Sequence, residues 1–169
     1  MKPIVSIIMG STSDLKVMEA ACNHLEKLEI PFEVNALSAH RTPQQVLDFA
    51  KAAMGRGIKV IIAGAGGAAH LPGVVAALTP LPVIGVPIKA SISMDGWDSM
   101  LSMIQMPPGI PVATVALNGA MNAAILAMQM MALGDEAMMQ KLEAYKAGLK
   151  KKIVKANEDL AKLEYKYKV

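Results

Sequence analysis

The sequence predicts a three-layer α/β/α domain built on a doubly wound parallel sheet of five strands, followed by a long C-terminal helix. Five short apolar runs, rich in β-branched residues, alternate with segments whose apolar residues recur at helical spacing. The runs are apolar throughout, which is typical of strands buried on both faces of a parallel sheet. The alternation and the buried strands together favour a flavodoxin-like arrangement.

The predicted strands and helices follow one another along the chain. The strands are expected at 4–9, 32–37, 60–63, 83–86 and 112–117. The helices are expected at 15–28, 43–56, 73–78, 97–105 and 121–133, with a last helix beginning at 135. Thr42 is a good N-cap for the second helix, and Pro43 suits its first turn. Cys22 falls on the apolar stripe of the first helix, which indicates a core thiol rather than a reactive one.

The last helix does not belong to the alternating pattern. We therefore divide the chain into an α/β domain, 1–134, and a helical extension, 135–169. The apolar stripe of the extension is Leu149, Ile153, Ala156, Leu160, Leu163 and Tyr167. A stripe with no covering surface in its own chain needs a partner, and a second copy of the chain is preferred over packing back onto its own domain.

Composition and charge limit the classes of function. With 169 residues, 53% of them hydrophobic and 18% charged, the chain suits one folded domain with a tail rather than disorder. The N-terminus lacks the pattern of a signal peptide, no apolar run is long enough to span a membrane, and the single cysteine forms no intrachain disulfide. These features predict a soluble cytoplasmic protein with no membrane partner.

The basic character of the chain is confined to its tail. Residues 141–169 contain nine Lys and four acidic residues, a net charge of +5, whereas 1–140 carry a net charge of −2. A basic tail can bind nucleic acid, but acidic and apolar residues interrupt the lysines here. A solvated helix face is the preferred interpretation, and no nucleic-acid partner is expected.

Three segments follow predicted strands and carry side chains or backbone groups suited to a ligand. The segment MGSTSD offers the hydroxyls of Ser11 and Ser13 at a helix start, which suits a phosphate as well as an ordinary cap. The segment SAHRTP places Arg41, a forked donor for phosphate or carboxylate, beside His40, which exchanges protons near neutral pH. Ligands of open parallel sheets bind outside the carboxyl ends of the strands, so these loops are expected to meet.

The third segment, GAGGAAH, is rich in glycine. It formally matches the G-x-G-x-x-A dinucleotide fingerprint, but it follows the third strand, and no acidic residue stands about twenty residues further on. We interpret Gly64, Gly66 and Gly67 as a cradle of backbone amides for a small flat or anionic group. His70 is either a second acid/base or a residue that orients this loop. The three segments together suit a sugar phosphate or mononucleotide, with proton transfer and no cofactor or metal.

The segments GSTSD, SAHRTP, AGAGGAAHLPG and QMPPGIPVAT, in this order, resemble the PurE family of 5-(carboxyamino)imidazole ribonucleotide mutases over about residues 3–135. The resemblance implies a cytoplasmic homo-octamer of purine (IMP) biosynthesis. It implies an isomerase that converts 5-(carboxyamino)imidazole ribonucleotide to 4-carboxy-5-aminoimidazole ribonucleotide, with active sites near subunit contacts. In the family's second class, which carboxylates aminoimidazole ribonucleotide with carbon dioxide, a Lys follows the histidine. Arg41 and Pro43 match the mutase class instead.

The resemblance also implies a role for individual residues. His40 would be the catalytic acid and base, Ser11, Ser13 and Arg41 would hold the phosphate, and Asp14 would bind the ribose hydroxyls. Ser38 and Ala39, with His40, would line the base and the carboxylate. Backbone amides facing the ligand would come from Ala65, Gly66 and the neighbouring Gly67, and Leu71 would close over them. The alternatives that stay open are the direct carboxylase and a non-catalytic mononucleotide-binding module.

Overall fold

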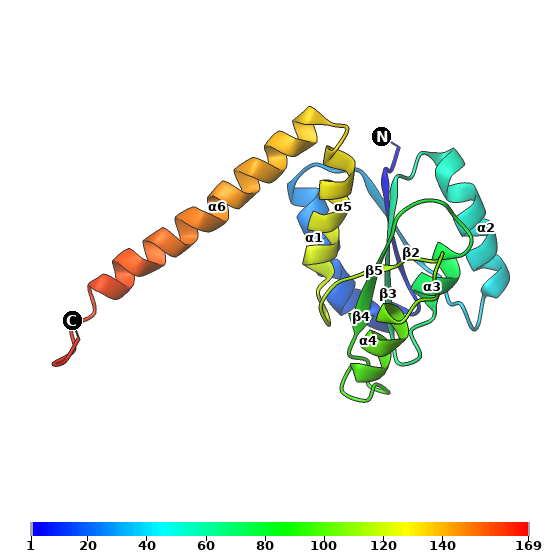
Figure 1. The fold of residues 1–169 in the computed structure, drawn as a ribbon, viewed down its shortest axis with the longest axis horizontal. Helices are drawn as coiled ribbons and strands as arrows, with labels where there is room; N and C mark the ends of the chain where they lie inside the picture. Colours follow the sequence, from blue (N-terminus) through cyan, green and yellow to red (C-terminus); the bar gives the residue numbers. More distant parts are fainter. Residues whose placement is uncertain (1, 169) are drawn as a thin grey trace.

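A computed structural model describes residues 2–168 and has the predicted three layers (Figure 1). One sheet of five parallel strands has the order β2-β1-β3-β4-β5, the doubly wound order expected from the sequence. Its strands are β1 (Val5–Met9), β2 (Phe32–Ala36), β3 (Val60–Gly66), β4 (Val83–Ile88) and β5 (Ala113–Thr114). The helices are α1 (Leu15–Lys27), α2 (Pro43–Ala53), α3 (Leu71–Ala76), α4 (Trp97–Ile104), α5 (Ala120–Ala132) and α6 (Glu136–Ala161), with 3₁₀ turns at Thr12–Asp14 and Met54–Arg56.

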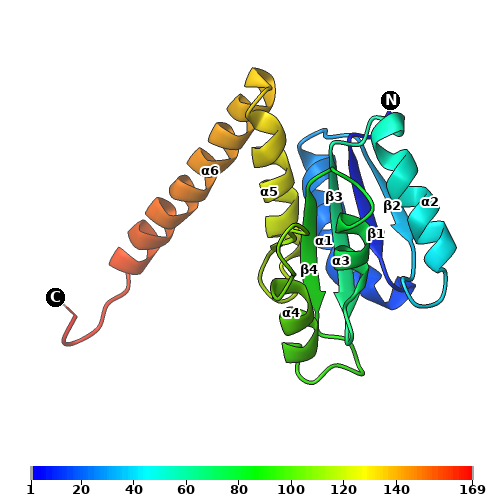
Figure 2. The same ribbon diagram turned by 45° about the vertical axis from the view of Figure 1, so that its right-hand side comes forward.

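The core lies on both faces of the sheet. Helices α1 and α5, with the start of α6, cover one face, and the residues that pack there include Met18, Leu25 and Met128. Helices α2, α3 and α4 lie on the other face, where Val46 and Met103 are fully buried. Figure 2 shows the strands running side by side toward one end of the sheet, so all their carboxyl ends meet there. That arrangement brings the three candidate loops together.

Strands β4 and β5, at one side of the sheet, differ in length from the prediction. Strand β4 continues through Pro87 to Ile88, although proline lacks a backbone N–H. Its neighbour β5 pairs only with Ile84 and Gly85, so no strand lies beside Pro87 on that side to require the N–H. Strand β5, at one edge of the sheet, spans two residues instead of six and pairs with β4 only through Ala113 and Thr114.

The second helix begins at Pro43 as predicted, but Thr42 does not cap it through its side chain. The Thr42 hydroxyl donates to the Ser38 carbonyl and accepts from the Ser38 amide, both at 3.1 Å. The hydroxyl therefore closes the turn of residues 38–42, which contains His40 and Arg41. Cys22 is half-buried against the core, and burial raises the pKa of its thiol.

Helix α6 leaves the α/β core as a straight arm (Figure 1), about 39 Å long at 1.5 Å per residue. Its first turns are held to the core by buried Met138 and Leu142 and by the edge-on contact of the His24 and Tyr145 rings. The Lys141 ammonium donates to the Leu28 carbonyl at 2.6 Å. The division of the chain at residue 134 stays a prediction.

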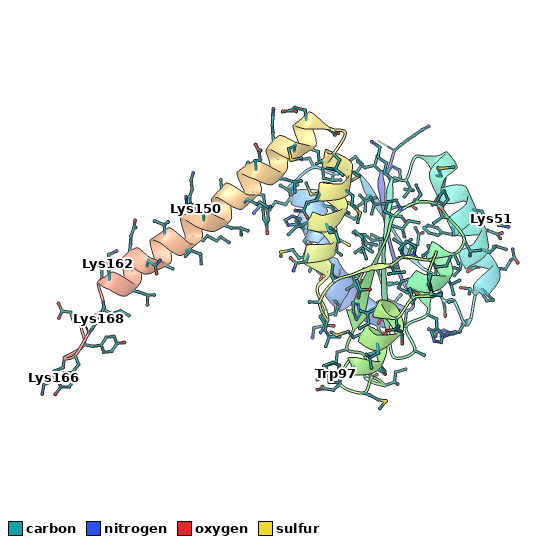
Figure 3. All side chains as sticks on the ribbon, in the orientation of Figure 1. Lys51, Trp97, Lys150, Lys162, Lys166 and Lys168 are labelled. Atoms are coloured by element: carbon teal, nitrogen blue, oxygen red, sulfur yellow. The ribbon has the colours of Figure 1, made fainter. Side chains whose placement is uncertain are left out.

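Beyond these contacts every described residue of the arm, 146–168, is exposed. Figure 3 shows Lys150 and Lys162 on the arm far from the core. The predicted stripe is helical only as far as Ala161, because a turn replaces the helix before Leu163 and Tyr167. The Lys168 ammonium caps the helix end by donating to the carbonyls of Leu160, Ala161 and Leu163. The arm thus does not fold back onto its own domain.

Among residues 2–168, no helix combines the length and the apolar character needed to cross a bilayer.

Candidate active site

A cavity of about 340 Å³ opens at the carboxyl end of the sheet. It is formed by the loops that follow β1, β2, β3 and β4. Its lining residues are Gly10, Ser11, Ser13, Asp14, Ser38, Ala39, His40, Arg41, Ala65, Gly66, Ala68, Leu71, Ala90, Ser91 and Ile92. Of the residues to which the resemblance gives a role, all but Gly67 line this cavity. Four loops far apart in the sequence therefore form one site.

The loop after β1 supplies two serine hydroxyls and one carboxylate. Ser11 caps the 3₁₀ turn by accepting the amide of Ser13 at 3.3 Å, as a helix N-cap does. Asp14 is 5% exposed. This burial raises the pKa of its carboxyl, while hydrogen bonding from Ser11 and Ser13 and the charge of Arg41 act in the opposite direction. A buried carboxylate at the floor of a cavity is placed to accept hydrogen bonds from a ligand.

Arg41 joins the loops after β1 and β2. Its Nη2 donates to the Gly10 carbonyl at 3.2 Å, and its Nε lies 3.4 Å from the Ser38 hydroxyl. The backbone amide of Arg41 also donates to that hydroxyl, at 3.2 Å. The guanidinium is thus fixed at the cavity that Ser11 and Ser13 also line, where it can present its remaining donors to an anion.

His40 lies at the mouth of the cavity against a second imidazole. Its Nε2 is 2.8 Å from Nδ1 of His70, the residue just before α3, and the ring planes are perpendicular. Both side chains are exposed. The sequence did not predict this contact, because thirty residues and a strand separate the two histidines. It gives His70 a definite neighbour that the loop motif alone did not reveal.

The glycine loop is partly strand. Strand β3 continues through Gly66, three residues beyond its predicted end, and Gly64 lies within the sheet and does not line the cavity. Gly66 has no room for a side chain, since a Cβ there would lie 2.6 Å from the Cβ of Ala90. Gly67 adopts a positive φ of 62° and does not line the cavity, although the next residue, Ala68, does. The cradle is thus narrower than predicted, with Ala65, Gly66 and Leu71 facing the ligand space.

Sequence reasoning missed the wall formed by Ala90, Ser91 and Ile92. These residues follow β4, which the sequence ended at Val86. The available signal was positional: β4 neighbours β3 in the sheet, so the loop after it must lie at the same edge as the glycine loop. The residues themselves have no motif of their own.

Within residues 2–168, no group of three or more His, Cys, Asp and Glu side chains is gathered as metal ligands would be. The lining residues instead combine hydrogen-bond donors suited to an anion, a buried carboxylate, an imidazole and the backbone groups of small residues. Such a cavity can bind a phosphorylated sugar carrying a flat base and move protons on that base.

Comparison with known proteins places the chain among relatives that share this fold. The profile of the AIR carboxylase family matches residues 4–152. The chain is 55% identical to the N5-carboxyaminoimidazole ribonucleotide mutase of Pyrococcus horikoshii, over 90% of this chain and 85% of that protein. It is 56% identical to the phosphoribosylaminoimidazole carboxylase of Candida glabrata, over 96% of this chain but only 28% of that longer protein.

The fold is also that of a solved relative. The crystal structure of Treponema denticola PurE superposes with a TM-score of 0.83 at 28% identity, covering 94% of this chain and 98% of the other. The family profile covers well over half of the residues, and the Pyrococcus relative is matched along most of its length. The chain belongs to the AIR carboxylase family.

Proposed function

We propose that the protein is an isomerase of purine (IMP) biosynthesis that converts N5-carboxyaminoimidazole ribonucleotide to 4-carboxy-5-aminoimidazole ribonucleotide. One observation carries the proposal most directly: His40 is the imidazole that lines a cavity otherwise equipped to bind a nucleotide. The names of relatives at 49–55% identity, matched over most of their length, support the same activity.

The substrate is proposed to lie across the cavity with its phosphate at the loop after β1. Ser11, Ser13 and Arg41 would bind the phosphate, because all three line the cavity and the guanidinium is held by the carbonyl of Gly10, the residue before Ser11. Asp14 would accept hydrogen bonds from the ribose hydroxyls. Its burial supports this role, because a desolvated carboxylate gains from hydrogen-bond donors that a ligand brings.

The base is proposed to lie between the loops after β2 and β3. Ser38, Ala39 and His40 would contact the imidazole and its carboxylate from one side. On the other side, Ala65 and Gly66 would contribute backbone groups and Leu71 would cover the ring. The positive φ of Gly67 sets the conformation of the loop that joins these residues.

The proposed reaction moves a carboxyl group from nitrogen to carbon with one imidazole. Protonated His40 gives its proton to the carbamate nitrogen as the N–C bond breaks, and that bond's electron pair stays on nitrogen. The released carbon dioxide is attacked by the neighbouring ring carbon, which the exocyclic amine makes electron-rich. Neutral His40 then accepts the proton of that carbon, so the histidine returns to its starting state and no proton is gained or lost.

The direct carboxylase is the nearest alternative. Arg41 and Pro43 match the mutase pattern, and the relatives of similar length are named as mutases, which supports the isomerase. A mononucleotide-binding module without catalysis would account for Arg41 and Asp14, but would give His40 no role. The isomerase accounts for all three residues.

We further propose a cytoplasmic homo-octamer in which the arm contacts another copy. The exposed Leu149, Ile153 and Leu160 on α6 support this, because an apolar stripe in water gains stability only when it is covered. The same holds for Trp97 and Leu101 on α4; Figure 3 shows Trp97 at the bottom of the α/β domain, away from the point at the top where the arm leaves it.

The deciding experiment supplies each possible substrate separately. The purified protein is incubated with N5-carboxyaminoimidazole ribonucleotide, or with aminoimidazole ribonucleotide plus bicarbonate, and the 4-carboxy product is measured. Product from the first substrate without added bicarbonate supports the isomerase. Product only from the second substrate identifies the carboxylase, and binding without product identifies the non-catalytic module.

A further inference from the structure

The segment that follows β4 lies directly on the glycine loop. A Cβ at Gly66 would meet the Cβ of Ala90 at 2.6 Å and the Ile88 carbonyl at 2.9 Å. A Cβ at Gly67 would meet Cδ1 of Ile92 at 3.1 Å and its Cγ1 at 3.4 Å. The absence of side chains on these two glycines therefore lets the loop carrying Ile92 approach the cavity closely.

Ile92 occupies an unusual place for an isoleucine. It lines the cavity and rests on Gly67, yet 81% of its surface is exposed. An apolar side chain that buries so little area contributes little to the stability of the fold. Its position at the rim of the site suggests that it acts on what the cavity holds.

The loop that carries Ile92 is fixed at both ends. The Lys89 amide donates to the Asn118 side-chain oxygen at 3.0 Å, and the Lys89 ammonium pairs with Asp95. The Ser93 hydroxyl donates to the Asp98 carboxylate, and this bond is the chief cause that lowers the pKa of Asp98. Ile92 is thus presented to the cavity by a loop with a defined shape.

The proposed isomerisation passes through free carbon dioxide, which the polar residues of the site bind weakly. Carbon dioxide is neutral and has no hydrogen-bond donor, so arginine and serine groups bind it weakly, while water carries it away once the cavity is open. Between cleavage of the N–C bond and formation of the C–C bond it must stay beside the ring carbon. An apolar wall that excludes water favours capture over escape.

We propose that the side chain of Ile92, seated on Gly67, closes the rim of the cavity and retains carbon dioxide during the isomerisation. The inference rests on the proposed mutase activity. It adds a residue and a role to that activity, since Ser11, Arg41 and Asp14 are proposed to bind the phosphate and the ribose rather than the carboxyl group.

The test measures how much carbon dioxide escapes in each turnover. Unlabelled N5-carboxyaminoimidazole ribonucleotide is converted in ¹³C-bicarbonate with carbonic anhydrase present, so that any released gas mixes with the labelled pool. Wild type is compared with Ile92→Ala and with a matched control, Ile104→Ala. Ile104 is 53% exposed on α4 and does not line the cavity. A reaction without enzyme gives the spontaneous exchange that is subtracted.

Ile92→Ala is expected to raise the label in the product about fivefold (about 1 kcal/mol in the relative barrier to escape), with free aminoimidazole ribonucleotide accumulating alongside. Ile104→Ala is expected to match wild type, and Ile92→Leu is expected to restore retention because it returns the apolar volume. If Ile92→Ala is an active mutase and its product carries no more label than the wild-type product, the inference about Ile92 is wrong and the proposed function still holds. A wild-type protein that does not convert the substrate contradicts the proposed function itself, a result distinguishable from the first.

Discussion

The imidazoles of His40 and His70 meet edge-on, with Nε2 of one 2.8 Å from Nδ1 of the other and ring centroids 5.0 Å apart. In the neutral pair one ring donates and the other accepts, so the contact fixes a tautomer relationship between them. Both rings are exposed, and water can take the place of either partner. Of the two, only His40 lines the cavity, and the proposed isomerisation needs one acid/base.

Replacing His40 by Asn is expected to lower kcat by roughly 10²–10⁴-fold, because Asn keeps a polar side chain but cannot exchange a proton. Steady-state assays of the mutase reaction would measure this loss, with nucleotide binding followed by calorimetry as the check on folding. The matched variant His70→Asn is expected to keep most of the turnover, since water can replace its hydrogen bond to His40. Near-normal turnover in His40→Asn would refute the mechanism.

Replacing Arg41 by Lys is expected to raise KM about tenfold with a smaller change in kcat, because one ammonium cannot make the forked contacts of a guanidinium. Arg56→Lys is the control. Arg56 pairs with Glu33 at 2.8 Å and does not line the cavity, so its KM should stay at the wild-type value. If both variants bind substrate equally well, Arg41 does not hold the phosphate.

Replacing Asp14 by Asn is expected to stabilise the free protein while weakening substrate binding. Burial raises the pKa of Asp14 in the folded state, so its favourable contribution is complete below the unfolded pKa of about 4 and is lost as pH rises through the folded pKa. The gain in Tm from Asp14→Asn should therefore be larger near neutral pH than near pH 4, as measured by calorimetry at both values. A gain in Tm that is larger near pH 4 than near neutral pH would show that the ionised form of Asp14 does not destabilise the folded protein.

Replacing Gly66 by Ala is expected to destabilise the fold by roughly 1–3 kcal/mol, because the new Cβ meets the Ile88 carbonyl, which is backbone and cannot rotate away. Gly55→Ala is the matched control. A Cβ at Gly55 meets nothing within 4 Å, so that variant should be neutral or slightly more stable. Urea unfolding of the two variants measures the difference. Equal stabilities would mean that the loops after β3 and β4 do not pack as described.

Removing residues 150–169 is expected to reduce the mass of the assembly in light scattering without unfolding the domain. The truncation leaves the buried anchors Met138 and Leu142 in place and deletes the exposed Ile153 and Leu160. Circular dichroism of the shortened protein checks that the core stays folded. An unchanged mass would show that the arm does not contribute to association.

Much of the fold followed from local patterns. Strand Val5–Met9 begins and ends within one residue of its predicted bounds, because a strand buried on both faces must be apolar throughout. The rule that ligands bind at the carboxyl ends of parallel strands then predicts that Ser11, Arg41 and Ala65 share one edge of the sheet, which the cavity confirms. Because β2, β1 and β3 are neighbours in the sheet, the residues that follow them lie close together at that edge.

The sequence alone determined the α/β class, the parallel sheet and three of the four loops that line the cavity, because periodicity and loop position are local properties. Only the tertiary structure decided the contact of His40 with His70, the continuation of β3 through Gly66 and the seating of Ile92 on Gly67. These depend on distances between segments far apart in the chain. The arm depended on both. Its apolar stripe is a local pattern that the sequence shows, whereas its direction away from the core depends on the burial of Met138 and Leu142 in the core.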